Sequence, residues 1–192
     1  MTVVMGWISE NTLSANQVTL QFYWLFSIVT FALGQGLSIR IGYILGSHNQ
    51  KSAHYATYLG VFYACTFMLF AAILYWVFAE KLIHLDFAST PENSEIIFLA
   101  KQFLALAAWV QIIEALRFSF CGALRGLKDT KFTLWISVLI YWGITLPLGY
   151  LLGIVFKLQG YGIWWATLLG QLLGTPLLIW RYHRKIRDYF LG

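Results

Sequence analysis

Long stretches of apolar residues, separated by short polar segments, dominate this chain. Five of them, at residues 17–45, 55–79, 96–122, 133–156 and 160–182, reach the roughly 20 residues that a helix needs to cross a lipid bilayer. A shorter apolar run at residues 1–8 precedes them, and we interpret it as the end of a truncated first helix. The pattern predicts an all-α integral membrane protein in which residues 1–192 form a single transmembrane helical bundle.

The composition supports a membrane environment. Only 11% of the residues are charged and 59% are hydrophobic, whereas a soluble domain carries about 25% charged residues. This number of charges is too small to cover a water-exposed surface. We therefore expect membrane lipids to surround much of the chain. The net charge of +5 falls mostly in loops and the tail, and no motif for nucleic-acid binding accompanies it.

The two cysteines, Cys65 and Cys121, lie inside apolar runs. Their spacing is typical of neither a disulfide scaffold nor a metal site. We therefore expect packed thiols, no metal and no cofactor.

Basic residues alternate from one connecting segment to the next. The basic segments include Lys51, Lys128 and Arg184, whereas residues 80–95 are rich in acidic residues. Cytoplasmic loops of membrane proteins carry the excess of lysine and arginine. The alternation predicts that the basic loops and the C-terminus face the cytoplasm.

Glu114 lies near the middle of the third complete span, and Arg117 follows three residues later on the same helix face. A charged carboxylate at the bilayer centre costs at least about 2.5 kcal/mol. One interpretation is an ion pair with Arg117 that merely permits burial. The other is that Glu114 binds a coupling ion, either Na⁺ or H⁺, and both interpretations stay open at this point.

Polar side chains also recur at helical spacing within the spans. Gln21, Trp24 and Gln35 belong to a stripe in the first complete span that continues through Ile28 and Phe31 in steps of three and four residues. Gln111 in the third span and Gln171 in the fifth are further candidates. Such a face could line a cavity for amphiphilic cations, with the aromatic rings facing the charge. Alternatively, the glutamines hold helices together by side-chain hydrogen bonds.

Pairs of glycines four residues apart are expected to let helices approach closely. They are Gly42/Gly46, Gly122/Gly126, Gly149/Gly153 and Gly170/Gly174.

Four short motifs connect this chain to a known family. They are Leu-Ser-Ala-Asn-Gln at 13–17, Ile-Arg-Ile-Gly-Tyr-Ile-Leu-Gly at 39–46, Leu-Arg-Gly-Leu-Lys-Asp-Thr at 124–130 and Leu-Pro-Leu-Gly-Tyr at 146–150. In this order and spacing they resemble the C-terminal half of the multidrug and toxic compound extrusion (MATE) transporters, most closely the NorM-like bacterial subgroup.

The resemblance implies a fold, an activity and a site. The chain would be the C-terminal lobe of a twelve-helix transporter, comprising part of helix seven and helices eight to twelve. Such transporters lie in the bacterial inner membrane and export cationic drugs in exchange for Na⁺ or H⁺ by alternating access. An acidic residue on helix ten participates in cation coupling, and Glu114 falls at that position.

Two features depart from the family pattern. Val110 stands where members have a tyrosine, one turn before the acidic residue, and that residue is glutamate where several members have aspartate. The N-terminal lobe is a further expected partner that is missing from the sequence, so we expect a fragment of a longer protein or the product of a split gene.

Two alternative functions remain. One is a lipid or polysaccharide flippase of the same superfamily, and the other is a membrane subunit or fragment that does not transport. An enzyme is not expected, because no nucleophile, general base and ligand set converges anywhere in the sequence.

Overall fold

A computed structural model describes residues 5–6, 9–46, 50–87 and 93–191. Its long helices are α2 (Glu10–Gly46), α3 (Gln50–Ile83), α4 (Ser94–Gly126) and α7 (Gln159–Leu191). Between α4 and α7 a further span consists of α5 (Thr130–Val138), η2 (Leu139–Thr145), α6 (Leu146–Tyr150) and η3 (Leu151–Val155). Within the described residues, five helical segments are long and apolar enough to cross a membrane, which confirms the predicted all-α membrane fold.

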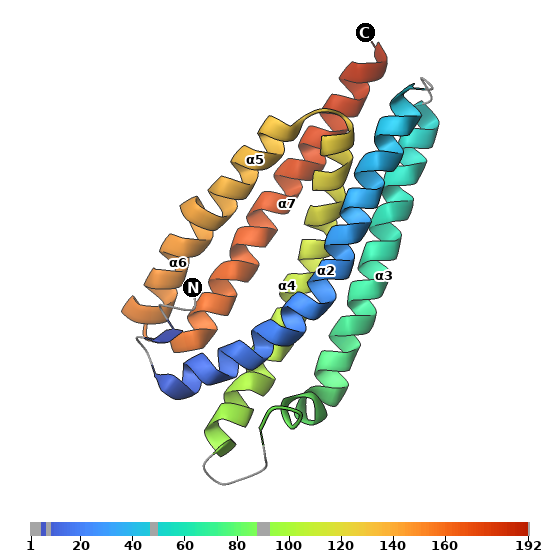
Figure 1. The fold of residues 1–192 in the computed structure, drawn as a ribbon. Helices are drawn as coiled ribbons and strands as arrows, with labels where there is room; N and C mark the ends of the chain where they lie inside the picture. Colours follow the sequence, from blue (N-terminus) through green and yellow to red (C-terminus); the bar gives the residue numbers. More distant parts are fainter. Residues whose placement is uncertain (1–4, 7–8, 47–49, 88–92, 192) are drawn as a thin grey trace.

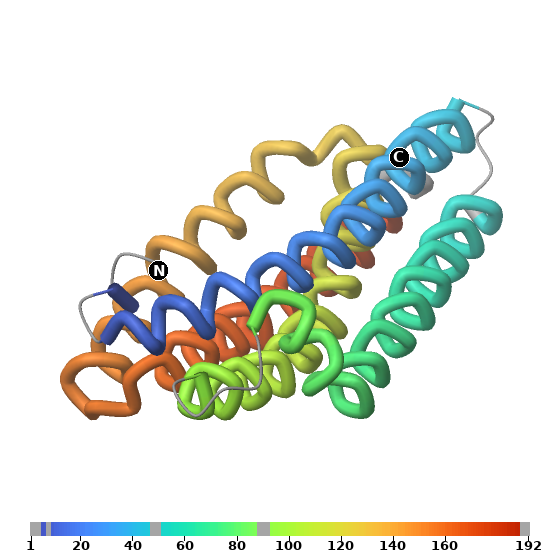
Figure 2. Tube along the Cα trace, turned by 60° about the horizontal axis from the view of Figure 1, so that its bottom comes forward, coloured from blue at the N-terminus to red at the C-terminus, as the bar shows by residue number. Residues whose placement is uncertain are grey.

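Successive spans run in opposite directions and pack side by side. α4 and α7 lie between α3 on one side and the α5–η3 span on the other, with α2 crossing in front of them (Figure 1). In the turned view, α3 and the α5–η3 span again lie on opposite sides of the bundle (Figure 2). In an 18-residue apolar segment of α4, half of the residues are buried, compared with 28% in the corresponding segment of α3. α4 is therefore a central helix, and α3 presents most of its surface outward.

The helices extend beyond the boundaries that the apolar pattern predicted. α2 begins at Glu10, not at residue 17, and the expected loop at 80–95 shortens because α3 continues to Ile83 and α4 begins at Ser94. Polar side chains at helix ends do not stop the backbone from hydrogen bonding, so hydropathy underestimates helix length. The expected truncated helix at residues 1–8 lies largely outside the described residues, as does Pro91.

The α5–η3 span is not a regular α-helix, because two wider π-helical segments interrupt it. Pro147 lacks an amide hydrogen and cannot continue the ordinary hydrogen-bond pattern. Just before it, the Leu146 amide donates to the Tyr141 carbonyl five residues back. π turns of this kind are frequent at functional sites, and this one carries Tyr141.

α2 and α4 approach each other closely through glycine. A Cβ atom added to Gly122 would overlap the Gly34 carbonyl, and one added to Gly126 would approach within 2.8 Å of the Ser38 carbonyl oxygen. Gly42 and Gly46, by contrast, face open space. The prediction for Gly122/Gly126 is therefore confirmed, whereas the pair Gly42/Gly46 mediates no packing among the described residues.

Among the described residues, two large apolar cores and one small cluster of Ala64, Met68, Ala71 and Ala115 lie along the bundle, with polar side chains between the two large cores. On α4 one core ends at Val110 and the other begins at Phe120. Gln111, Glu114 and Arg117 are buried between these limits. The fold thus places a polar layer in the middle of the bundle.

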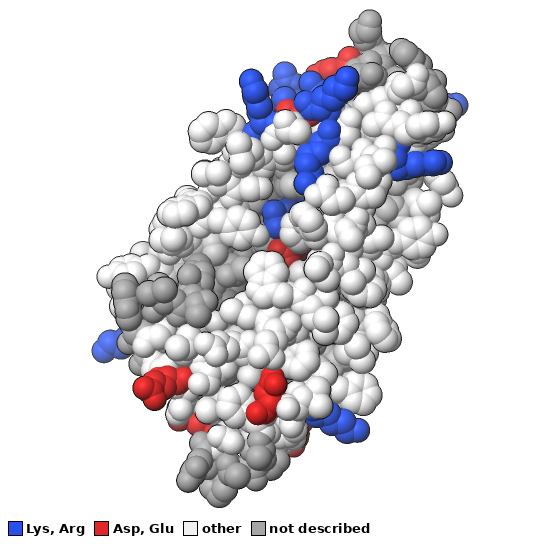
Figure 3. All heavy atoms as spheres, in the orientation of Figure 1, with Lys and Arg blue, Asp and Glu red and all other residues white. Residues whose placement is uncertain are grey.

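Charges separate between the two ends of the molecule (Figure 3). Most lysines and arginines lie where α2, α4 and α7 end, and we call this the basic end. The opposite end contains most of the acidic residues, including Glu10, Glu80 and Glu95.

Candidate functional site

Glu114 occupies the centre of the polar layer and is only 3% exposed. Its Oε2 atom accepts hydrogen bonds from the Tyr23 hydroxyl at 2.6 Å and from Ser27 Oγ at 3.1 Å. Its Oε1 atom lies 3.3 Å from Nη2 of Arg117, one turn further along α4. Both charged side chains are 5% exposed, so the carboxylate is held by three donors away from the lipid.

Gln111 completes the connection between α4 and α2. Its Nε2 atom donates to the Tyr23 carbonyl at 2.8 Å and to Ser27 Oγ at 3.2 Å. Tyr23 and Ser27 are four residues apart on α2, while Gln111 and Glu114 are three apart on α4. These spacings place each pair on one helix face, so two neighbouring turns of each helix meet at the site.

Arg117 links the site to the α5–η3 span and, through it, to α7. Its Nη2 atom also donates to the Tyr141 hydroxyl at 2.9 Å, and Gln171 Nε2 on α7 donates to the same hydroxyl at 3.3 Å. The guanidinium lies 5.3 Å from the centre of the Tyr141 ring and 4.5 Å from that of Phe118. The π turn before Pro147 thus supplies the residue that joins three helices.

Glu114 and Arg117 line different cavities. Glu114 faces a pocket of about 330 Å³ whose lining includes Tyr23, Trp24, Tyr141 and Trp164. Arg117 faces a groove of about 510 Å³ that also contains Arg125 and Lys131 and extends toward the basic end. The ion pair therefore divides an aromatic pocket with a carboxylate from a groove with cationic walls.

Several buried polar atoms around the ion pair form no hydrogen bond in the structure. Among them are Oε1 of Gln111, Oε1 of Gln171, Oγ1 of Thr145 and Nε of Arg117. Unsatisfied buried polar groups are costly and uncommon in folded proteins. Amide and hydroxyl oxygens of this kind are suitable partners for a hydrated cation or for the polar part of a ligand. No group of three or more histidine, cysteine or acidic residues that could hold a metal ion occurs in the part of the chain that the structure describes.

The structure brings together some of the residues predicted from the sequence and leaves others apart. Glu114, Arg117, Gln111 and Gln171 belong to the polar layer, and Trp24 lines the pocket next to Glu114. Gln21 is exposed and Gln35 is half-buried, and neither is among the residues that line this pocket. The polar stripe that we expected on α2 is displaced, because the packed face includes Tyr23, Ser27 and Thr30 instead.

Sequence reasoning missed Tyr23, Ser27 and Tyr141 as partners of the ion pair. For the first two, the signal was present in the chain. Thr19, Tyr23, Ser27, Thr30 and Gly34 follow helical steps of three and four, and small or polar residues at such spacing are typical of a packed membrane-helix face. Tyr141 had no comparable signal, since its position depends on the π turn.

Comparisons with known proteins give the same answer for the family throughout. The MatE family model matches residues 1–151. The probable multidrug resistance protein NorM of Burkholderia pseudomallei is 30% identical over 184 residues, covering 95% of this chain and 39% of that protein. The protein of the same description from Oceanobacillus iheyensis is 33% identical over 181 residues, covering 94% and 40% respectively.

Solved structures agree on the fold. The Vibrio cholerae MATE transporter VcmN in its bent form has a TM-score of 0.85 at 18% identity, with 99% of this chain and 42% of that chain covered. The eukaryotic MATE transporter AtDTX14 has a TM-score of 0.81 at 22% identity, with coverage of 98% and 43%. The chain thus spans about two fifths of the length of the relatives it matches.

Proposed function

Because this chain belongs to the MatE family, we propose that it forms the C-terminal lobe of a multidrug efflux antiporter. The assembled transporter would export cationic drugs in exchange for Na⁺ or H⁺. Its partner would be a second lobe, since alternating access requires two bodies that rock around a central site. The named relatives, described as multidrug resistance proteins, support this proposal.

The observation that carries the proposal is the carboxylate of Glu114 at the wall of an aromatic pocket. An acidic residue in the middle of a membrane bundle is expensive and usually marks an ion or substrate pathway. Tyr23, Trp24, Tyr141 and Trp164 line the same pocket, and aromatic faces attract organic cations. The pocket therefore offers both a negative charge and ring faces to a cationic amphiphile.

Coupling follows if the ion and the drug compete for this one carboxylate. A proton or Na⁺ on Glu114 would neutralise its charge and weaken its attraction for a cationic drug. Release of that ion on the other side of the membrane would restore the charge. In this scheme Tyr23 and Ser27 orient the carboxylate, because both donate to its Oε2 atom.

Tyr23 also offers an explanation for the departure at position 110. Family members have a tyrosine one turn before the acidic residue, whereas this chain has Val110, which is fully buried. Here the tyrosine hydroxyl comes from α2 and lies 2.6 Å from the carboxylate. We propose that Tyr23 replaces the missing tyrosine as a partner of the coupling residue.

The separation of charge supports an orientation in the bacterial inner membrane. The basic end would face the cytoplasm together with the C-terminus, because lysine and arginine are retained on that side. A cysteine-free background tests this, with Cys65 and Cys121 replaced by serine. A membrane-impermeant maleimide on intact cells should label Glu95→Cys and leave Lys128→Cys unlabelled, and the reverse pattern would overturn the orientation.

One observation favours the alternative of a flippase for anionic lipids or polysaccharides. The groove next to the pocket is lined by Arg117, Arg125 and Lys131, which would attract an anionic headgroup. Under this alternative, the assembled transporter would move an anionic lipid, and Lys131→Gln would lower that transport. Under the efflux proposal, the assembled transporter exports the dye and moves no lipid.

The decisive experiment uses the assembled transporter in proteoliposomes with an imposed Na⁺ or H⁺ gradient. Glu114→Gln should abolish gradient-driven transport of ethidium. Glu80→Gln, which changes an exposed acidic residue paired with Lys101, is the matched control and should transport normally.

A double variant separates the two interpretations of Glu114. Glu114→Gln with Arg117→Gln removes both charges, so no uncompensated arginine remains buried. If the ion pair only permits burial, the double variant should fold and transport. If Glu114 couples the ion, the double variant should fold without gradient-driven transport, and normal transport by it would refute the coupling role.

A further inference from the structure

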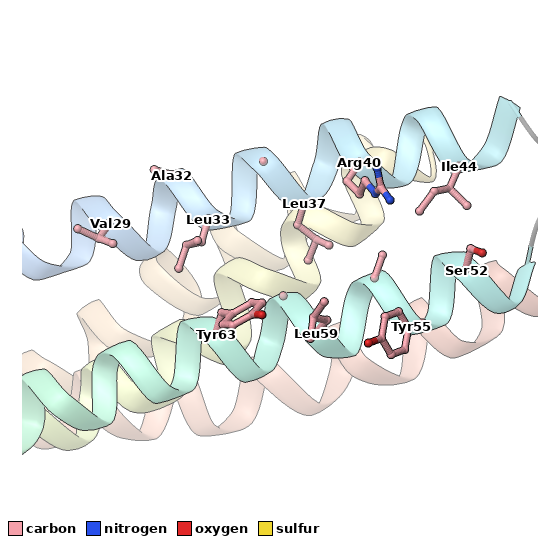
Figure 4. A pocket seen from close by; sticks show the side chains of 13 residues that line it. Val29, Ala32, Leu33, Leu37, Arg40, Ile44, Ser52, Tyr55, Leu59 and Tyr63 are labelled. Atoms are coloured by element: carbon pink, nitrogen blue, oxygen red, sulfur yellow. The ribbon is translucent and has the colours of Figure 1, made fainter.

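A second cavity lies on the other side of α2, between α2 and α3. It is a groove of about 570 Å³. Figure 4 shows Val29, Leu33, Leu37 and Arg40 on α2 across the gap from Tyr63, Leu59 and Tyr55 on α3. This groove shares no lining residue with the pocket of Glu114, so it is separate from the proposed transport site.

The chemistry of the groove changes along its length. The part nearest the basic end contains the polar side chains Arg40, Ser52 and Tyr55 beside Ile44, while Val29, Ala32 and Leu33 lie deeper in the bundle (Figure 4). From Arg40 to Val29 the helix rises about 16 Å at roughly 1.5 Å per residue. That length is about half of the ~30 Å hydrocarbon core, so the groove is polar at the interface and apolar over the depth of one lipid leaflet.

Arg40 has no acidic partner among the residues that the structure describes. The two described carboxylates of the basic end are already engaged. Asp129 lies 2.7 Å from Nε of Arg181, and Asp188 lies 3.9 Å from Nε of Arg184. The exposed guanidinium of Arg40 is therefore available to an anionic group from outside the described chain.

The space in the groove results from small residues on both helices. Gly36 has nothing within 4 Å of where a Cβ would stand, and on α3 Gly60 faces the side chain of Leu37. Ala32 and Ala56, which also line the groove, likewise have short side chains. An extended hydrocarbon chain can lie along such a surface without displacing protein atoms.

We propose that this groove binds one anionic phospholipid. Its phosphate lies at Arg40 in the interfacial region, where Tyr55 is 70% exposed and aromatic rings favour the headgroup level. One acyl chain lies against Leu37, Gly36 and Leu33. We assign a lipid because the groove joins one cationic group at the interface to an apolar channel one leaflet deep. We assign an anionic headgroup because Arg40 has no acidic partner among the described residues.

The first test measures lipid binding to the purified transporter by native mass spectrometry. Phosphatidylglycerol should bind more tightly than phosphatidylcholine, and Arg40→Gln should weaken phosphatidylglycerol binding about fivefold, as expected for one basic group at a membrane surface. Lys128→Gln removes an exposed charge from the same end and should change binding less than twofold. Unchanged phosphatidylglycerol affinity in Arg40→Gln would overturn the proposal.

The second test fills the groove. Gly36→Leu should lower the affinity for both lipids, since its side chain occupies the acyl-chain position. Gly42→Leu is the matched control, because Gly42 lies on the same helix, also faces open space, and does not line the groove. Equal effects of the two substitutions would contradict the site.

A protection experiment separates a lipid from a protein occupant. In the cysteine-free background, maleimide labelling of Gly36→Cys in delipidated transporter should slow on addition of phosphatidylglycerol, whereas labelling of Gly42→Cys should not. If Gly36→Cys resists labelling with and without lipid, a protein segment covers the groove, and the lipid proposal is wrong. Neither result bears on transport through Glu114, so the two proposals succeed or fail separately.

Discussion

The two faces of α2 are made of opposite kinds of residue. The face toward α4 contains Thr19, Tyr23, Ser27, Thr30 and Gly34, all buried. The outer face exposes large apolar side chains, with Ile28 65% exposed and Ile39 76% exposed. In water this arrangement would be unstable. In a bilayer, lipid solvates the apolar face, whereas the polar groups must find their partners inside the protein.

The difference shows which residues determine helix association in this bundle. Apolar side chains gain little by leaving lipid for another apolar surface, so packing relies on close backbone approach and on hydrogen bonds. The contact of Gly34 with Gly122 holds the two backbones close together. A short side chain such as Ser27 can then reach Glu114 across the interface.

The largest expected effect comes from the glycine contact. Gly122→Leu should destabilise the protein by at least about 3 kcal/mol, because its side chain would overlap the α2 backbone, which cannot move aside. Gly42→Leu enters open space and should leave stability unchanged. Thermal unfolding in detergent measures both, and equal melting temperatures would show that this contact does not hold α2 on α4.

The ion pair gives the next effect on the same face. Glu114→Gln should cost about 3 kcal/mol of unfolding free energy, since it leaves Arg117 buried without a counter-charge. Adding Arg117→Gln should recover most of that loss. A double variant as unstable as the sum of its single variants would mean that the two side chains act independently.

Tyr23→Phe tests the hydrogen bond from α2 to the carboxylate. The loss of a donor to a charged group should cost about 1.5–3 kcal/mol. Tyr43→Phe is the control, because Tyr43 is 77% exposed on the same helix and should lose less than about 0.5 kcal/mol. Chemical denaturation of the two variants side by side measures the difference, and equal stability would argue against the bond.

The smallest stability effect is expected for exposed apolar side chains of α2. Trp24→Ala and Ile28→Ala remove side chains of equal fractional exposure, and each should change stability by less than about 0.5 kcal/mol. Only Trp24 lines the pocket of Glu114. Its loss should raise the ethidium concentration for half-maximal transport about two- to tenfold, as expected for one cation–π contact. The same shift in Ile28→Ala would refute a specific role for Trp24.

Much of the fold could be predicted from the sequence. A bilayer has no water in its core, so long apolar runs with few charges must become spanning helices, and the structure contains a helix at each of the five predicted spans. The same reasoning made Glu114 a candidate site residue, because a carboxylate in an apolar span is expensive wherever it lies. Its position beside Arg117 followed from their spacing on one helix.

Only the tertiary structure decided what surrounds these residues. Whether Tyr23 or Trp24 faced α4 depended on the rotation of α2 about its axis. That rotation is set by Gly34 against Gly122, a contact between helices distant in the sequence. Tyr141 reaches Arg117 from a π turn, which local pattern does not encode. The groove at Arg40 exists because small residues of α2 and α3, among them Gly36 and Gly60, line it once the two helices pack. Hydropathy reports the preference of each segment for lipid, whereas the rotation and spacing of helices arise from contacts that form only when all of them pack.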